Sequence, residues 1–144
     1  MRIQALVDAG FRALRDGKSA DAVLAFREAI LLGPESPALE SYFAMALAAA
    51  GDGRHADKAL ASALARVGTA SPLLPEGVKE LFSGAEAFDK MLGALEKGAP
   101  HGRLTSAFLH LAAKNEEKAK TLLDAILQDA PKDAAASKLR SLVE

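Results

Sequence analysis

Small residues recur at a fixed interval of 34 positions in the first half of the chain (51 − 17 = 34). The recurring pairs are Gly17 and Gly51, Ala22 and Ala56, and Ala29 and Ala63. A small residue at a fixed point of a helical hairpin lets the two helices approach closely, and its recurrence indicates that the same contact is made again one unit later. The interval therefore predicts stacked helical hairpins of near-equal size.

The composition favours helices throughout the 144 residues. Alanine is frequent and β-branched residues are too scattered for a sheet, while aromatic residues make up only 5% of the chain, so the core is expected to be aliphatic. Gly, Pro and small polar residues recur at short intervals and indicate turns. Between these turns the apolar residues follow helical spacing, as at Leu60, Ala63, Leu64 and Val67. We predict one all-α domain of about nine helices joined by short turns.

The second half of the chain has an interval of its own. Residues 85–100 align with residues 116–131, a step of 31 (131 − 100 = 31), which suggests trimmed turns. Helix starts are marked by Ser36 followed by Pro37, and by Ser83 with Glu86 three residues later, a capping-box pattern.

Charge and residue usage exclude several classes of function. The 18 basic and 19 acidic residues give a net charge of −1, which removes the long-range attraction that a nucleic-acid or acidic-membrane binder needs. The absence of cysteine excludes disulfides, thiolate catalysis and cysteine-based metal sites. An acid at Asp8 interrupts any secretory apolar stretch, and the longest apolar run, residues 43–50, is too short to span a membrane. We expect a soluble, cytoplasmic protein without membrane insertion.

No group of residues predicts catalysis, a cofactor or a metal. The sequence Gly51 to Ala56 fits G-x-G-x-x-A, but an alanine-rich helix precedes it where the dinucleotide motif needs a strand. His55, His101 and His110 lack the i, i+4 spacing of helical zinc sites, and no nucleophile is adjacent to a base. The prediction is a protein that is not an enzyme.

The first unit, residues 3–36, resembles the tetratricopeptide repeat, a helix-turn-helix unit of 34 residues. The matching positions are Gly10, Gly17, Ala22, Phe26, Ala29 and Pro34. Further units resemble it over residues 37–70 and 100–131, whereas residues 71–99 are atypical because Pro72 and Pro75 shorten the first helix. The resemblance implies a right-handed α-solenoid of about four repeats over residues 1–144.

Residues 132–143 would form a closing helix of this solenoid. Its charged side chains, Lys132, Asp133, Lys138 and Arg140, are expected to face water, as the terminal cap of a stack of repeats must.

The resemblance also implies a concave groove lined by the first helix of each pair. The predicted partner-binding residues are Val7, Phe11, Leu14, Arg15, Ser41, Met45, Ala48, Leu104, Phe108 and Leu111. Phe11, Leu14, Met45 and Phe108 are the expected anchors, with Arg15 orienting a carboxylate or carbonyl. Val7 and Phe11 stand where some family members use Lys and Asn to clamp a peptide carboxylate, so an apolar or amphipathic segment is the expected ligand.

Two functions fit this reading. The first is a non-catalytic scaffold that holds a protein or peptide segment in the groove. The alternative is a self-assembling structural protein, a homo-oligomer joined through the groove or the ends of the stack. The helix over residues 37–50 is apolar on nearly every side, so either a partner covers it or neighbouring helices and the irregular third unit do.

Overall fold

Residues 2–33 and 35–143 are described by a computed structural model, and within these ranges every regular element is a helix. The longer helices are α1 (Arg2–Arg15), α2 (Ser19–Leu32), α3 (Pro37–Ala49), α4 (Gly53–Ala65), α6 (Ala85–Lys97), α7 (Arg103–Ala112) and α8 (Glu116–Asp129). The short elements are the 3-10 helix η1 (Ser71–Leu73), α5 (Val78–Leu81) and α9 (Ala134–Arg140). The predicted all-α fold is confirmed. Pro34, expected to close the first unit, lies outside the described residues.

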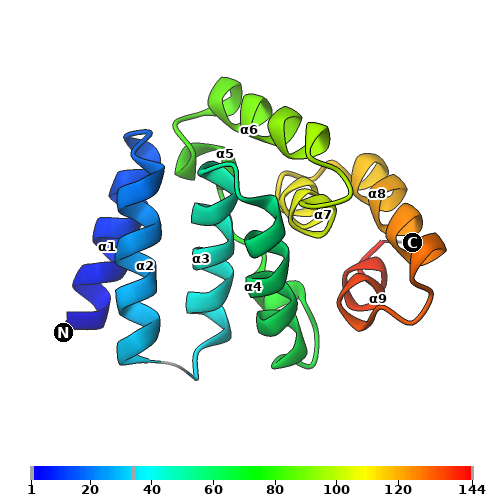
Figure 1. Ribbon diagram of the computed structural model, residues 1–144, viewed down its shortest axis with the longest axis horizontal. Helices are drawn as coiled ribbons and strands as arrows, with labels where there is room; N and C mark the ends of the chain where they lie inside the picture. The colour runs from blue at the N-terminus through cyan, green and yellow to red at the C-terminus, as the bar shows by residue number, and fades with distance from the viewer. Residues whose placement is uncertain (1, 34, 144) are drawn as a thin grey trace.

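The first two hairpins, α1–α2 and α3–α4, stand side by side with their helices parallel to one another (Figure 1). Each hairpin turns through a glycine in the left-handed region, Gly17 at φ 75° and Gly51 at φ 84°, which L side chains rarely adopt. Ser36 starts α3 as expected, because its hydroxyl accepts a hydrogen bond of 3.2 Å from the Leu39 amide. The two hairpins are thus built from the same local signals one interval apart.

Within a hairpin, the large and small residues compensate for each other. A Cβ added at Gly10 would lie 2.5 Å from the ring of Phe26, so α1 must carry glycine where it crosses that ring. One interval of 34 later the chain has Ala44 and Leu60, both buried (44 − 10 = 34; 60 − 26 = 34). The matching positions thus exchange glycine for the larger alanine and phenylalanine for the smaller leucine, a pair of opposite volume changes of the kind that packed cores tolerate best.

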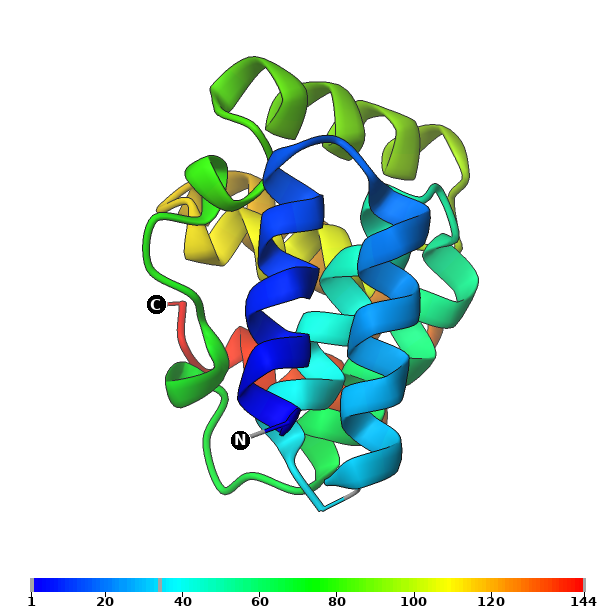
Figure 2. The ribbon, with the colours of Figure 1, turned by 90° about the vertical axis from the view of Figure 1, so that its left-hand side faces the viewer.

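The third unit departs from the hairpin pattern. Between α4 and α6 the chain forms only η1 and the four-residue α5, and it runs along one side of the molecule beside α1 (Figure 2). Pro72 lies in the first turn of η1, where a missing amide is tolerated, and Pro75 follows directly after its end. Most of residues 66–84 is therefore a segment that packs on the hairpins and does not extend their stack.

One helix-start prediction is wrong. Ser83 does not cap α6 together with Glu86; the residue before α6 is Gly84, which makes no side-chain cap. Ser83 has a positive φ of 74°, and its hydroxyl instead donates to the carbonyl oxygens of Leu14 and Arg15 at the end of α1. The hydroxyl that resembled a local cap is thus a contact between the third unit and the first.

The second half joins the first through α4. The carboxylate of Asp57 on α4 accepts hydrogen bonds from the Gly102 amide (2.7 Å), the Thr105 amide (2.9 Å) and the Thr105 hydroxyl (2.8 Å) at the start of α7. It therefore satisfies amides that the first turn of α7 leaves without an intrahelical acceptor. Helix α6 crosses over α3 and α7, and α8 and α9 complete the far end (Figure 1).

The closing helix is present, but its charged residues do not all face water. Lys138 on α9 donates to the carbonyl oxygens of Leu64 (2.6 Å) and Val67 (2.7 Å) at the end of α4. Arg140 donates to the Asp124 carboxylate (2.8 Å) and to the carbonyl oxygen of Val143 (2.6 Å). Basic side chains suit the carbonyl-rich end of a helix, so these residues fasten α9 to the stack.

Candidate protein interface

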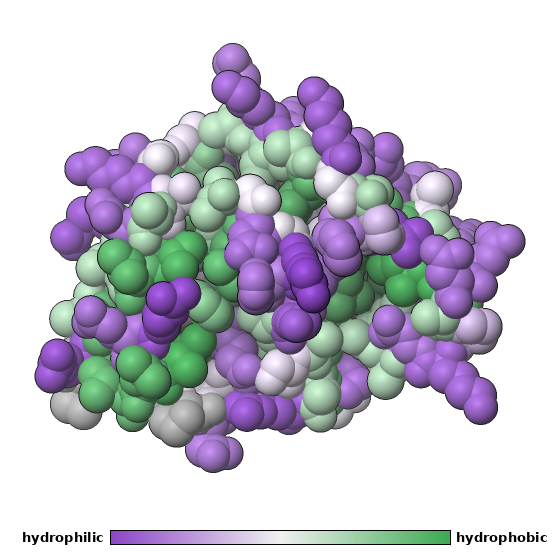
Figure 3. Space-filling view, viewed as in Figure 1, coloured by the Kyte–Doolittle hydropathy of each residue, from purple (hydrophilic) through white to green (hydrophobic). Residues whose placement is uncertain are grey.

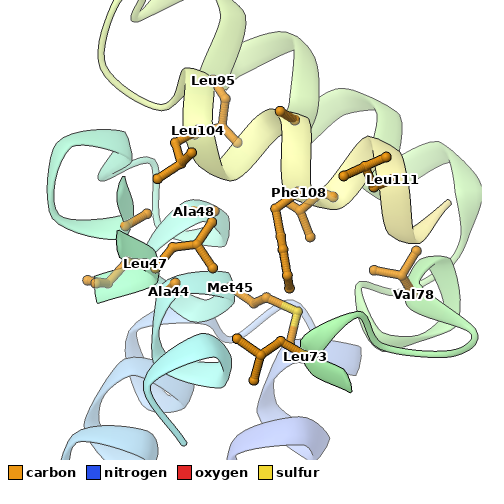
Figure 4. Close-up of a cluster of buried hydrophobic side chains, with 14 of the residues drawn as sticks. Ala44, Met45, Leu47, Ala48, Leu73, Val78, Leu95, Leu104, Phe108 and Leu111 are labelled. Carbon is orange, nitrogen blue, oxygen red and sulfur yellow. The ribbon is translucent and has the colours of Figure 1, made fainter. Parts of the chain in front are cut away.

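The structure places most of the predicted groove residues in the core. The buried ones are Leu14, Ser41, Met45, Ala48, Leu104, Phe108 and Leu111. Met45 is 1% exposed and Phe108 is 0% exposed, and the close-up shows Phe108 pointing toward Met45 and Leu73 (Figure 4). Leu73 and Val78 come from the third unit. The space over Met45 and Phe108 is therefore filled by the chain itself, which corrects the expectation that these two anchors face an open groove.

The other three predicted residues, Val7, Phe11 and Arg15, are not buried. Val7 and Phe11 are half-buried, and the Phe11 ring meets the edges of Phe26 and Tyr42 at centroid distances of 5.1 and 4.8 Å. Arg15 is exposed at the end of α1, where its carbonyl oxygen accepts from Ser83. Phe11 thus packs against two aromatic rings of the same chain, one on α2 and one on α3.

A different cleft is open on the side of the second helices, and sequence reasoning missed it. We call it the α2–α4 cleft; it has a volume of about 550 Å³ and is lined by Arg27, Ile30, Glu40, Phe43, Leu47, Asp52, His55, Lys58 and Ala59. The apolar side chains of α3 form its floor, because α3 lies between α2 and α4 (Figure 1). Concave apolar surfaces with a few polar groups at the edge are the usual binding sites of proteins.

The two carboxylates of the cleft are already paired. Glu40 lies 3.0 Å from the Arg66 guanidinium. Asp52 lies 2.8 Å from the His55 ring; burial favours a higher pKa for this carboxyl, but the hydrogen bonds from the His55 side chain and amide outweigh it and leave the pKa below its usual value.

The two cations of the cleft walls have no carboxylate partner among the described residues. The Arg27 guanidinium lies 5.8 Å from the centroid of the Phe43 ring, a cation–π contact. Lys58, on the opposite wall, makes no ion pair within residues 2–33 and 35–143. Glu40 is neutralised by Arg66 and the Asp52 carboxylate is hydrogen-bonded to His55, whereas Arg27 and Lys58 have no carboxylate beside them in the described part of the chain, so these two cations favour an acidic group on whatever enters the cleft.

Large apolar side chains stand exposed beside this cleft. Leu24 is 54% exposed, Leu31 is 75% exposed and Leu32 is 45% exposed, all on α2. Leu24 and Leu31 lie two turns apart on the side opposite the buried Ala22, Phe26 and Ala29, and the space-filling view shows apolar surface gathered over α2 (Figure 3). The sequence signal was present, because a surface helix needs only one apolar stripe and α2 carries a second.

Neither a metal site nor a membrane span is apparent in the residues that the structure describes. No group of three or more His, Asp or Glu side chains is placed to hold a metal ion in these ranges. No helix in them combines the length and the apolar character that crossing a membrane requires.

Helices that pack in successive pairs around recurring small residues define an α-helical repeat protein. In a comparison with family models, residues 83–143 match the one described as tetratricopeptide repeat, which supports the resemblance to that family. Repeats of this family generally mediate protein–protein interaction without catalysis. The matched segment is the second half, although the residues most typical of the repeat lie in the first unit. No curated protein and no solved structure matches the chain.

Proposed function

We propose that this chain is a non-catalytic interaction scaffold that docks a protein segment in the α2–α4 cleft. The observation that carries the proposal is an open cleft of about 550 Å³ with an apolar floor. Two leucines of α2 that are more than half exposed stand beside it. Burial of apolar surface is the main driving force of such docking, at about 25 cal/mol per Å². The cytoplasmic location that the sequence predicts is part of this proposal.

The inner residues offer a competing site. A segment held by Met45 and Phe108 would need η1 to leave the inner side first, because Leu73 of η1 lies beside both side chains (Figure 4). That step would expose a large part of the core to water, so the outer cleft is the better supported surface.

Site-specific photo-crosslinking in the native host tests this proposal. A photoreactive amino acid at Leu24 is expected to form protein adducts, whereas one at Lys90, exposed on α6, is expected to form none. Leu31→Glu should abolish the adducts from position 24, and Ala94→Glu, which adds the same acid on α6, should not. Adducts from Phe11 or Lys90 in the absence of adducts from Leu24 would move the binding surface elsewhere.

A further inference from the structure

We propose that the occupant of the α2–α4 cleft is a second copy of this chain, so that two copies bury each other's α2. This inference rests on the proposed function and names the partner of the same surface. It is carried by a match between two features of one molecule: an exposed stripe on α2, and the cleft beside that helix.

The stripe consists of Leu24, Glu28 and Leu31. Their spacing of four and three residues places them on one side of the helix, and all three are exposed. Glu28 makes no ion pair or hydrogen bond within the described ranges, so its carboxylate is available. The stripe therefore presents an acid between two leucines.

The cleft is complementary to the stripe in charge and in the placement of its apolar residues. Its floor of Phe43 and Leu47, with Ile30 on one wall, can receive the leucine side chains. Its two walls carry Arg27 and Lys58, the cations without a carboxylate partner described above. An acid flanked by leucines thus fits an apolar floor flanked by bases.

The geometry of the repeats allows both copies to dock at once. Helices α2 and α4 are the second helices of successive hairpins, so they run in the same direction (Figure 1). Residues of both helices line the cleft. A two-fold axis parallel to α2 places each α2 over the other copy's cleft, because the stripe and the cleft lie on neighbouring sides of that helix. The contact is isologous, which is the commonest way for identical chains to close a dimer.

The charge of the whole chain also permits the contact. A net charge of −1 leaves little repulsion between two copies, and chains near zero net charge associate more readily than highly charged ones. The electrostatic attraction between two copies therefore depends mainly on the local charges of the stripe and the cleft.

Sedimentation velocity of the full chain over a concentration series reaching about 1 mM, the weak end of specific association, is the first test. We expect a shift from 15.0 kDa to twice that mass. Leu31→Glu should raise the dissociation constant at least about 100-fold, because it places a second acid in an apolar cleft at both symmetric contacts. Ala94→Glu, which adds the same acid at an exposed apolar position of α6 away from the stripe and the cleft, is the control and should leave the constant within about 3-fold.

Charge exchange between two variants tests the pairing itself. Glu28→Lys and Lys58→Glu should each weaken self-association, because each puts like charges together at both contacts. A mixture of the two variants should associate more tightly than either variant alone, since each contact of the mixed dimer then joins opposite charges. Circular dichroism should be unchanged throughout, because the substituted side chains are exposed.

The outcomes separate this inference from the proposed function. A chain that stays monomeric over the whole series, while position 24 crosslinks to a different protein, overturns the second copy and keeps the cleft as a docking surface. A dimer that withstands Leu31→Glu, or a mixture no tighter than its components, overturns the pairing described here. A dimer lost on Leu31→Glu and recovered by charge exchange supports it.

Discussion

Replacing Phe108 by alanine tests whether the inner side of the repeats is closed. Phe108 on α7 is fully buried and reaches toward Met45 of α3 and Leu73 of η1 (Figure 4). The substitution removes the ring that these three elements share. If the third unit fills the inner side, the substitution leaves a cavity in the core and should lower the free energy of unfolding strongly. If the inner side is an open groove, the ring lies at the surface and its removal should change the free energy of unfolding little.

The expected size of this effect follows from the burial. A buried Phe→Ala substitution lowers the free energy of unfolding by about 3 to 5 kcal/mol, the lost transfer free energy of the ring plus the cavity that remains. For 144 residues the entropy of unfolding is about 0.3 kcal/mol per kelvin, so a loss of about 4 kcal/mol lowers Tm by about 13 °C. That loss is a large fraction of the about 5 to 15 kcal/mol that stabilises a typical domain.

Urea denaturation followed by circular dichroism, with a thermal scan beside it, measures both quantities. Phe11→Ala serves as a comparison, because the Phe11 ring is only half-buried and should cost less. A loss below about 1 kcal/mol for Phe108→Ala, with an unchanged slope against urea, would show that the ring faces solvent and that the reasoning about a closed inner side is wrong.

Two further predictions concern the polar contacts of the second half. Asp57→Ala should lower the free energy of unfolding by about 2 to 3 kcal/mol, because the Gly102 and Thr105 donors lose a charged acceptor, and Asp57→Asn should recover part of it in the same urea titration. Burial lowers the pKa of His110, with Glu96 opposing the effect, so the neutral ring is favoured in the fold. Stability should therefore be full above the unfolded value of 6.5 and fall as the pH drops below it, and His110→Gln should flatten this slope in a pH series of urea titrations.

The fold was largely predictable because its signals are local and repeated. Gly17 and Gly51 predicted the hairpin turns, and Ala22 with Ala56 predicted the close helix contacts; both pairs take these places in the structure. The capping box at Ser83 failed for the opposite reason. A serine hydroxyl can bond a nearby amide or a distant carbonyl, and the contact with α1, 68 residues away, is not visible in the local sequence.

The site was less predictable because an apolar position does not state what covers it. Met45 and Phe108 read as groove residues by their place in the first helix of a unit, but whether a partner or the third unit lies on them depends on where residues 66–84 go. The outer cleft was not predicted because the family resemblance implies a groove on the first helix of each pair, whereas this cleft lies between the second helices. Leu24 and Leu31 do not belong to the buried apolar stripe of α2. Apolar residues outside that stripe are a local sign, visible in the sequence, of an exposed apolar surface.

The atypical third unit connects these two observations. The inner groove of a repeat protein is lined by the first helices, so a repeat without a full first helix cannot extend it. The apolar residues of that repeat, such as Leu73 and Val78, must still be buried. They are buried on the inner side, against the side chains that the first helices would otherwise present to a partner. The second helices are not covered in this way, so α2 and α4 keep their outer surfaces exposed. Shortening one helix by prolines at positions 72 and 75 is thus accompanied by a covered inner face and leaves the opposite face of the first two hairpins uncovered.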